Sequence, residues 1–531
     1  MSERRWNGWG DPRVCAELPR GALAYLRERL GVPALPRDAD LASVTAAVPP
    51  SRLPVHAGLD ASAEARVRHA RGQSLADWFA LRFGRIGCFP DAVAFPSTGE
   101  EFRGLIEFAR QTGAALVPYG GGTSVAGHLA PVGSSPETPV VAVSTSRRCG
   151  LLELDRASRL ATFGAGTPGP RIEAALNGAG YTLGHFPQSF EYSTLGGWIV
   201  TRSSGQQSLY YGRIEALFAG GTVETPIGTL RIPTVPASAA GPDLREAVLG
   251  SEGRIGFVTD AVVRVRPLPE EESFHGIFFR AWPEAFATAR ELSQSGIPLS
   301  MVRLSNAAET LTAMRLAGGG TAKRLQQGYL SMRGAREAAC LLILGITGTK
   351  ASARTAFESA RRIWRRGGGI DAGPRIGDRW KRQRFAGVYL RNALWERGYA
   401  VDTFETAVDW PRVEATVASM ESAARAAFGR EPVHAYTHLS HVYPQGSSVY
   451  STVIFPILAD YDANVARWSR LKRNVSEAIV ASGGTISHQH GVGLDHKPYL
   501  EAEKGPLGIG LLRAAFAYFD PDGIMNPGKL V

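Results

Sequence analysis

The stretch that decides the fold reads Pro118-Tyr119-Gly120-Gly121-Gly122-Thr123-Ser124-Val125-Ala126-Gly127. It follows the apolar run 114–117, which predicts a short buried strand. Three consecutive glycines carry no Cβ, so their backbone N–H groups can converge on an anion, and Thr123 and Ser124 add hydroxyl donors. A triple glycine taken alone is equally often a surface turn. The spacing does not match the GxGxxG motif, and no Lys follows the glycines as it does in a Walker loop. The loop therefore favours a phosphate ligand but does not identify the molecule that carries the phosphate.

The composition is that of a globular protein. The chain has 531 residues, 44% of them hydrophobic and 20% charged, enough for two large or three ordinary domains. No apolar run reaches the ~20 residues of a membrane span, and the first residues lack an apolar signal core. Four scattered cysteines support neither a zinc site nor a disulfide framework. We therefore expect a cytoplasmic enzyme.

The net charge of +10 is compatible with nucleic acid, an anionic membrane surface or an anionic substrate. The densest basic cluster, 361–366, comes without a helix-turn-helix, zinc-finger or RNP pattern. We therefore expect no nucleic acid, and a phosphorylated, membrane-derived substrate is the better match.

The order of helical and strand-like patterns predicts four parts. These are an N-terminal helical extension (1–85), a nucleotide-binding domain of two small α+β units (86–270), a cap domain with an antiparallel sheet and covering helices (271–480), and a C-terminal segment (481–531).

Some individual elements are also predicted. A helix over 74–83 has Ser74 as its N-cap, and another helix covers 410–428. The tract 261–266 alternates like an edge strand, and 318–333 is expected to be a mobile loop.

Four glycine-rich tracts are more specific together than any one alone. They are the loop at 118–127, Ser193-Thr194-Leu195-Gly196-Gly197-Trp198, Gly250-Ser251-Glu252-Gly253 and Asp520-Pro521…Asn526-Pro527-Gly528-Lys529. Together they resemble the FAD-binding fold of the vanillyl-alcohol oxidase/PCMH type. Within that type, the chain is most similar to the alkyldihydroxyacetonephosphate synthase (alkylglycerone-phosphate synthase) family. That likeness extends to Trp6-Asn7-Gly8-Trp9-Gly10, Thr403-Phe404-Glu405-Thr406 and Ser487-His488.

The resemblance implies an α+β fold: a PCMH-type FAD-binding domain of two α+β subdomains, an antiparallel-sheet cap and a C-terminal segment that returns to the active site. It also implies noncovalent FAD. His128 is the only His or Cys adjacent to the glycine loop, and no covalent bond to it is expected. The implied FAD contacts are Pro118, Tyr119, Gly120, Gly121, Gly122, Thr123, Ser124, Gln188, Ser189, Phe190, Glu191, Tyr192, Ser193, Thr194, Thr201, Arg202, Ser203, Ser204, Gly205, Gln206, Gln207, Ser251, Glu252, Gly253, Arg254, Ile255, Gly256, Phe257 and Val258.

By resemblance, Tyr450 is the catalytic tyrosine that exchanges a proton with carbon one of the substrate. A phenol titrates near ~10, so it needs a neighbour to act as a base, and His490 is the expected helper with His488 nearby. A core tyrosine with its hydroxyl bonded to backbone is the alternative. The family's histidine triplet is His488-Gln489-His490 here, and a glutamine cannot shuttle a proton. Whether His490 carries the relay is left open.

Three residues match expected substrate contacts. Arg391 matches a substrate-contacting arginine of the family, Arg303 is a second candidate, and Thr403 is a lesser polar contact. A guanidinium suits phosphate because it donates paired hydrogen bonds. A structural salt bridge is the alternative for either arginine.

The resemblance implies exchange of the acyl group of 1-acyl-dihydroxyacetone phosphate for a long-chain alcohol. The flavin N5 would add to carbon one after proton removal, with no net redox change.

We expect a homodimer. Amphipathic helices in 1–85 would permit peripheral membrane contact, although core packing explains them equally well.

An FAD-dependent D-2-hydroxyacid dehydrogenase or oxidase of the same fold is the alternative. Its relatives carry a metal-binding His-x-Gly-Asp-Gly-Asn-x-His motif. The matching stretch, 441–450, lacks the acidic residue and the second histidine, so no metal is expected. Gln489-His490-Gly491 is nevertheless similar to the Glu-His-Gly of that group. The polar site residues disfavour an inactive flavin-binding scaffold.

Replacing Tyr450 by Phe removes the hydroxyl and leaves the ring. We expect acyl-for-alkyl exchange to be lost while the purified protein keeps its yellow flavin absorbance. An exchange assay on the Tyr450→Phe variant checks this, and an unchanged rate would remove Tyr450 from the mechanism.

Overall fold

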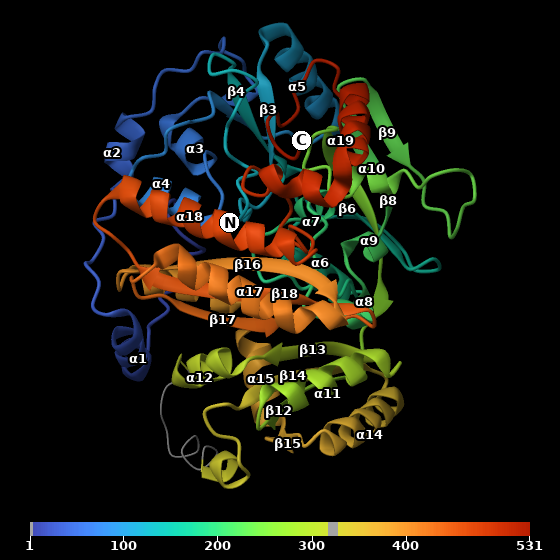
Figure 1. The fold of residues 1–531 in the computed structure, drawn as a ribbon. Helices are drawn as coiled ribbons and strands as arrows, with labels where there is room; N and C mark the ends of the chain where they lie inside the picture. Colours follow the sequence, from blue (N-terminus) through green and yellow to red (C-terminus); the bar gives the residue numbers. More distant parts are fainter. Residues whose placement is uncertain (1–3, 317–327) are drawn as a thin grey trace.

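Two small sheets form one lobe of the molecule and a seven-stranded sheet forms the other (Figure 1). The computed structural model describes residues 4–316 and 328–531. In those ranges no helix is both long and apolar enough to cross a membrane.

The first small sheet has four strands in the order β1-β2-β4-β3. Their bounds are β1 (Leu59–Asp60), β2 (Ala92–Ala94), β3 (Ala115–Tyr119) and β4 (Val140–Ser144). Helix α5 (Gly99–Thr112) begins at a capping box of Thr98 and Glu101, and Phe102, Leu105 and Ile106 on its apolar face are buried.

The C-terminal residues extend this sheet. Leu116 N donates to Ile524 O at 2.7 Å, and Asn526 N donates to Leu116 O at 2.8 Å. The segment therefore runs parallel to β3, immediately before the glycine loop. The carboxylate of Asp520 accepts from the N–H groups of Ile524 and Met525 and so fixes the turn that precedes it.

The second small sheet is antiparallel, in the order β5-β6-β10-β8-β9. Its strands are β5 (Leu151–Asp155), β6 (Leu160–Gly164), β8 (Phe218–Thr225), β9 (Gly228–Ile232) and β10 (Phe257–Arg264). The elements around it are α6 (Gly169–Asn177), β7 (Tyr181–Thr182), α7 (Leu195–Val200), α8 (Ser208–Tyr211), α9 (Ile214–Leu217), α10 (Arg245–Val248) and β11 (Arg266–Pro267).

The prediction of an edge strand over 261–266 is wrong. Strand β10 lies at the centre of its sheet, between β6 and β8. Its residues alternate between buried and half-buried from Asp260 onward. One face of an antiparallel sheet can stay partly solvated even at a central strand, and this produces the same alternation.

The cap has seven strands in the order β15-β12-β14-β13-β17-β18-β16. They are β12 (Glu271–Phe279), β13 (Leu299–Ser305), β14 (Cys340–Gly348), β15 (Ile370–Asp371), β16 (Tyr399–Asp409), β17 (His434–Leu439) and β18 (Gly446–Pro456). The helices of the cap and C-terminal part are α11 (Trp282–Gln294), α12 (Ala307–Leu316), α14 (Lys350–Arg366), α15 (Pro374–Gln383), α16 (Leu390–Trp395), α17 (Trp410–Phe428), α18 (Tyr461–Ala481) and α19 (Leu500–Phe519).

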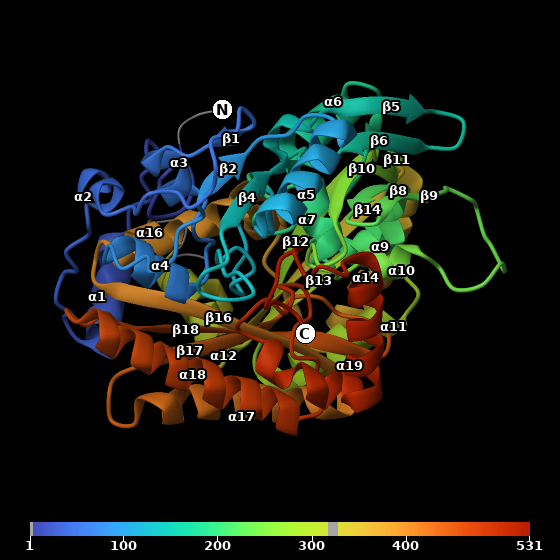
Figure 2. The same ribbon diagram turned by 90° about the horizontal axis from the view of Figure 1, so that it is seen from above.

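The two faces of the cap sheet have different neighbours. Helices α17 and α18 lie along the strands β16 to β18, as the view from above shows (Figure 2). On β14, Leu342 and Leu344 belong to the large core that includes residues of α11 and α14, whereas Leu341 and Ile343 line a cavity on the opposite face. Successive side chains of β14 therefore point alternately into the packed core and into a space large enough for a ligand.

The N-terminal extension wraps the side of both lobes (Figure 1). Its helices are α1 (Arg20–Leu30), α2 (Leu41–Ala46), α3 (Ala63–Arg68) and α4 (Leu75–Arg82). The prediction of Ser74 as an N-cap is confirmed, and Asp77 completes a capping box there. In the expected loop at 318–333, residues 318–327 lie outside the described residues and 328–332 are helical.

One contact attaches the N-terminus to the cap. Trp9 N donates to Asn392 Oδ1 at 3.1 Å, and Asn392 Nδ2 donates to Trp9 O at 2.9 Å, both in buried surroundings.

We expect Asn392→Ala to lower the free energy of unfolding by about 1–3 kcal/mol, because two buried backbone groups lose their partner. Denaturant unfolding would measure it. Asn177→Ala, at the exposed end of α6, is the matched control, and an equal effect in both would contradict the assignment.

Candidate active site

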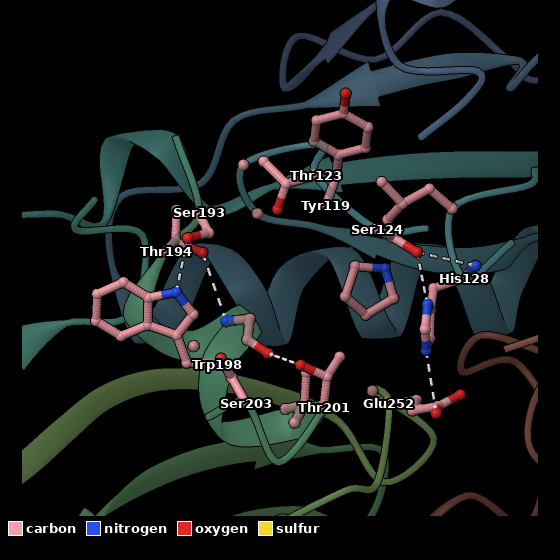
Figure 3. Close-up of a pocket in the computed structure, with 18 of the residues that line it drawn as sticks. Tyr119, Thr123, Ser124, His128, Ser193, Thr194, Trp198, Thr201, Ser203 and Glu252 are labelled. Atoms are coloured by element: carbon pink, nitrogen blue, oxygen red, sulfur yellow. Dashed lines mark hydrogen bonds and ion pairs between the residues drawn. The ribbon is translucent and has the colours of Figure 1, made fainter. Parts of the chain in front are cut away.

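A cavity lies between the two small sheets, beside the glycine loop. Its walls come from the loop 118–125, from α7 with the residues before it, from the turn at 252–258 and from the C-terminal segment. Figure 3 shows Thr123, Ser193, Thr194, Thr201 and Glu252 around it.

The glycine loop packs directly on the backbone of the opposite wall. A Cβ at Gly121 would lie 2.7 Å from the carbonyl carbon of Tyr192 and closer still to its oxygen, and one at Gly120 would lie 2.5 Å from Thr194 Oγ1. In the described part of the chain, the N–H groups of Gly121, Gly122 and Thr123 have no protein partner. Backbone donors without a partner at the edge of a cavity are suited to a diphosphate.

Three polar side chains in contact with one another also line this cavity. His128 lies between Ser124, whose Oγ is 2.5 Å from Nδ1, and Glu252, whose Oε1 is 3.0 Å from Nε2 (Figure 3). Glu252 also accepts from Val492 N at 2.5 Å and Gly493 N at 2.9 Å. The same carboxylate therefore connects the glycine loop with the C-terminal segment.

The expected FAD contacts divide into those that line this cavity and those that do not. The lining residues are Pro118, Tyr119, Gly120, Gly121, Gly122, Thr123, Ser124, Ser189, Ser193, Thr194, Thr201, Ser203, Glu252, Gly253, Gly256, Phe257 and Val258. Gln188, Ser204 and Gln206 line a second cavity. The remaining expected contacts line neither cavity and are Phe190, Glu191, Tyr192, Arg202, Gly205, Gln207, Ser251, Arg254 and Ile255.

Several residues behind the wall have structural contacts of their own. The ring of Phe190 stacks on Phe385 at 4.7 Å, and Gln207 Nε2 donates to Glu272 at 2.9 Å. Arg254 donates to the carbonyls of Met525 and Asn526. Phe190, Gln207 and Arg254 do not line the cavities, and their contacts stabilise the loops that do.

The second cavity, of about 840 Å³, lies between the cap sheet and α15. Its apolar walls include Phe278, Met301, Leu330, Ile343 and Trp380. Gln489 lines both this cavity and the one beside the glycine loop, so the two spaces meet at its side chain. Gln489 Oε1 is buried without a hydrogen-bond partner and so remains free to accept one from a ligand.

Tyr450, on β18, lines the second cavity. Burial raises the pKa of its phenol, a hydrogen bond with Thr403 opposes that shift, and Glu405 raises the pKa further. The phenol is therefore protonated near neutral pH, and proton removal by Tyr450 requires a base beside it. Two imidazoles meet this ring: His490 edge-on at 5.8 Å and His438 stacked at 4.9 Å.

His490 is held by a buried carboxylate that the sequence did not single out. Glu405 accepts from Gln489 N at 2.8 Å and His490 N at 2.7 Å, and its Oε1 lies 3.2 Å from His490 Nδ1. Burial lowers the pKa of His490, and Glu405 partly offsets this, so the ring is neutral at pH 7 and backed by a carboxylate. The tract 403–406 was the only sequence signal for Glu405.

The other candidate residues have different neighbours. His488 Nε2 lies 2.6 Å from Tyr443 Oη and 3.0 Å from Arg213 Nη1, and His488 lines neither cavity. Arg391 donates to Gln73 O, stacks over Trp78 at 4.4 Å, and also lies outside both cavity walls. Arg303 lines the second cavity and pairs with Glu309 at 2.5 Å.

Two family models match the chain. Residues 90–232 match an FAD binding domain, and residues 268–530 match the C-terminal domain of FAD linked oxidases. The free N–H groups of the glycine loop and the hydroxyls of Ser193, Thr194 and Thr201 fit a dinucleotide with a diphosphate. The cofactor of this protein is FAD.

We expect Gly121→Ala to abolish flavin binding, because the added Cβ collides with backbone atoms of Tyr192 that cannot move aside. The flavin absorbance of the purified variant measures this. Gly104→Ala, in α5 with no atom within 4 Å of its added Cβ, is the control and should keep its flavin. Normal flavin content in Gly121→Ala would contradict the close approach of the two loops.

Known proteins resemble the chain over most of its length. An alkyldihydroxyacetonephosphate synthase of Trypanosoma brucei brucei is 30% identical, with 88% of this chain and 78% of that protein covered. The synthase of Dictyostelium discoideum is 28% identical over 99% of this chain and 93% of its own. A solved alkyldihydroxyacetonephosphate synthase structure superposes with a TM-score of 0.86 at 26% identity, covering 99% of both chains. The chain therefore belongs to the alkyldihydroxyacetonephosphate synthase family.

Proposed function

We propose that this protein is an FAD-dependent alkylglycerone-phosphate synthase, which exchanges the acyl group of 1-acyl-dihydroxyacetone phosphate for a long-chain alcohol. The observation that carries the proposal is the junction of two cavities. A cleft with free backbone donors meets an apolar chamber of about 840 Å³, and Gln489 lines both. Tyr450 lies on the wall of the chamber, and its ring contacts His490, which lines the cleft.

The chamber suits the chain of a lipid. Its walls are largely aliphatic and aromatic, and burying such a chain is favourable by about 0.8 kcal/mol per methylene. Four arginines also line it and offer charge to a phosphate: Arg303, Arg375, Arg379 and Arg384. Arg391 and Thr403 stay proposed substrate contacts, Thr403 through its hydrogen bond with Tyr450.

The residues around Tyr450 handle the carbon-bound proton. Tyr450 is protonated at rest, and His490, neutral and backed by Glu405, is the neighbouring group able to take a proton. FAD, when bound, supplies a nucleophilic ring nitrogen. The carboxylate of the substrate then leaves with its electron pair, and the alcohol oxygen takes its place at carbon one, so no oxidant is needed.

Gln489 occupies the middle position of the family's histidine triplet. Its amide can orient a substrate hydroxyl or carbonyl by hydrogen bonding, but it cannot carry a proton. We propose that His490 is the one member of this triplet that takes part with Tyr450 in the proton transfer, which is consistent with the contacts that Glu405 makes with it.

We further propose that the protein is cytoplasmic, forms a homodimer and contacts a membrane peripherally to collect its substrates. The net charge of +10 favours an anionic membrane surface.

Two assays separate this function from a D-2-hydroxyacid dehydrogenase. Under anaerobic conditions a hydroxyacid should leave the yellow flavin band unchanged, because the synthase reaction has no net redox step. Acyl-for-alkyl exchange on 1-acyl-dihydroxyacetone phosphate should proceed in the same preparation. Bleaching by the hydroxyacid together with no exchange would overturn the proposal.

A further inference from the structure

A second imidazole–carboxylate pair faces Tyr450 from the cap side. On neighbouring strands, His438 of β17 is the register partner of Tyr450 of β18, and their rings stack at 4.9 Å with 24° between the planes. His438 Nδ1 lies 3.0 Å from Glu309 Oε2. The first pair, His490 with Glu405, lies on the side of the FAD cavity, whereas His438 lines the apolar chamber.

The acidic partner in this second pair is held as a carboxylate. Glu309 Oε1 accepts from Arg303 Nη2 at 2.5 Å, and Arg303 Nη1 donates to Ser305 Oγ at 2.8 Å. Burial alone would raise the pKa of Glu309, but Arg303 and His438 outweigh burial and hold that pKa at about 2. Because Glu309 is ionised, it favours the His438 tautomer with its proton on Nδ1.

The other ring nitrogen, His438 Nε2, then carries no proton and can act as a base, and it points away from the carboxylate of Glu309. In the described residues no hydrogen bond from a protein group reaches His438 Nε2, and Nδ1 lies at ion-pair distance from Glu309 Oε2, at an angle outside that of a hydrogen bond. Burial lowers the pKa of His438, Arg303 lowers it further, and Glu309 raises it, so the ring is neutral at pH 7. A neutral imidazole backed by a carboxylate, on the wall of a chamber, has the form of a general base.

The proposed reaction contains two different proton transfers, one from carbon one and one from the incoming alcohol. We propose that His438, oriented by Glu309, takes the hydroxyl proton of the alcohol in the apolar chamber, while Tyr450 and His490 serve the carbon-bound proton. This assignment rests on the proposed function.

The step balances without a further reactant. The alcohol O–H bond breaks, the proton goes to His438 Nε2, and the oxygen electron pair forms the new bond to carbon one in place of the bond to the acyl carboxylate, which leaves with its own electron pair. Glu309 stabilises the imidazolium that results, and His438 later releases the proton to solvent.

The surroundings of His438 predict a pH dependence. The titratable groups that face it are Arg303 on β13, Glu309 on α12, Tyr450 on β18, and Tyr436 and His441 on its own strand and the following turn. Glu309 is the one carboxylate among these groups. Since the pKa of His438 lies below 6.5, alkyl product formation should fall as the pH drops through that lower value. In Glu309→Gln the carboxylate that raises this pKa is gone, so the fall should move to lower pH.

The experiment compares two reactions of the FAD-loaded enzyme. The first is exchange of labelled free fatty acid into 1-acyl-dihydroxyacetone phosphate without alcohol, which involves no alcohol proton. The second is formation of the alkyl product with hexadecanol. We expect His438→Gln to slow the second reaction by about 10²–10⁴-fold, the usual contribution of a general base, and to leave the first near the wild-type rate.

His434→Gln is the matched control. His434 is also buried on β17, but its Nε2 lies 2.8 Å from Thr312 Oγ1 and it does not line the chamber. It should leave both rates and the flavin content unchanged. Equal losses of both reactions in His438→Gln, no loss in either, or an acid limb that Glu309→Gln does not shift would each overturn the assignment. A wild-type enzyme that performs neither reaction would instead overturn the proposed function, and this assignment with it.

Discussion

The close contact between two backbone turns is the constraint on which the rest of the molecule depends. Gly121 lies against the carbonyl of Tyr192, and Gly120 lies against Thr194, so no side chain fits between the two small sheets at that point. In the described residues the N–H groups of Gly121, Gly122 and Thr123 have no protein partner, and all three residues line the cavity. Thr194 also accepts from Gly197 N at the start of α7, which fixes the opposite wall. The shape of the FAD cleft follows from these contacts.

Buried carboxylates perform the corresponding task on the cap side. Glu405 binds two consecutive N–H groups and one imidazole of the C-terminal segment, so that segment is held against β16. A buried charge without partners is energetically costly. The donors around each buried carboxylate must therefore lie where they can pair with it. The large apolar core also runs without interruption from the second small sheet into the cap. These contacts therefore fix the positions of the two cavities relative to each other, and the cavities meet at Gln489.

Regular elements were predictable because their signals are local. The helix expected over 410–428 matches α17, and the cap at Ser74 is present, since apolar periodicity and capping residues act within a few turns. The position of β10 was not predictable, because alternation does not say which strands lie on either side. His488 and His490 are two residues apart in an irregular segment, and only tertiary contacts show that one meets Arg213 and the other Glu405. Glu405 and His438 acquire their places through pairing between strands, and Glu309 through the packing of α12 on β13 and β17, which sequence spacing does not report.

The pairing of the C-terminal segment with β3 has a consequence for the order of synthesis. Residues 524–526 pair with β3 directly before the glycine loop, and Asn526 lines the FAD cavity and donates to Glu252 O. A ribosome that has made the first five hundred residues has therefore made a protein whose dinucleotide cleft still lacks one wall. The cleft is therefore complete only after residues 524–526 have paired with β3, and without that pairing one wall is absent even when every loop named in the cleft is present.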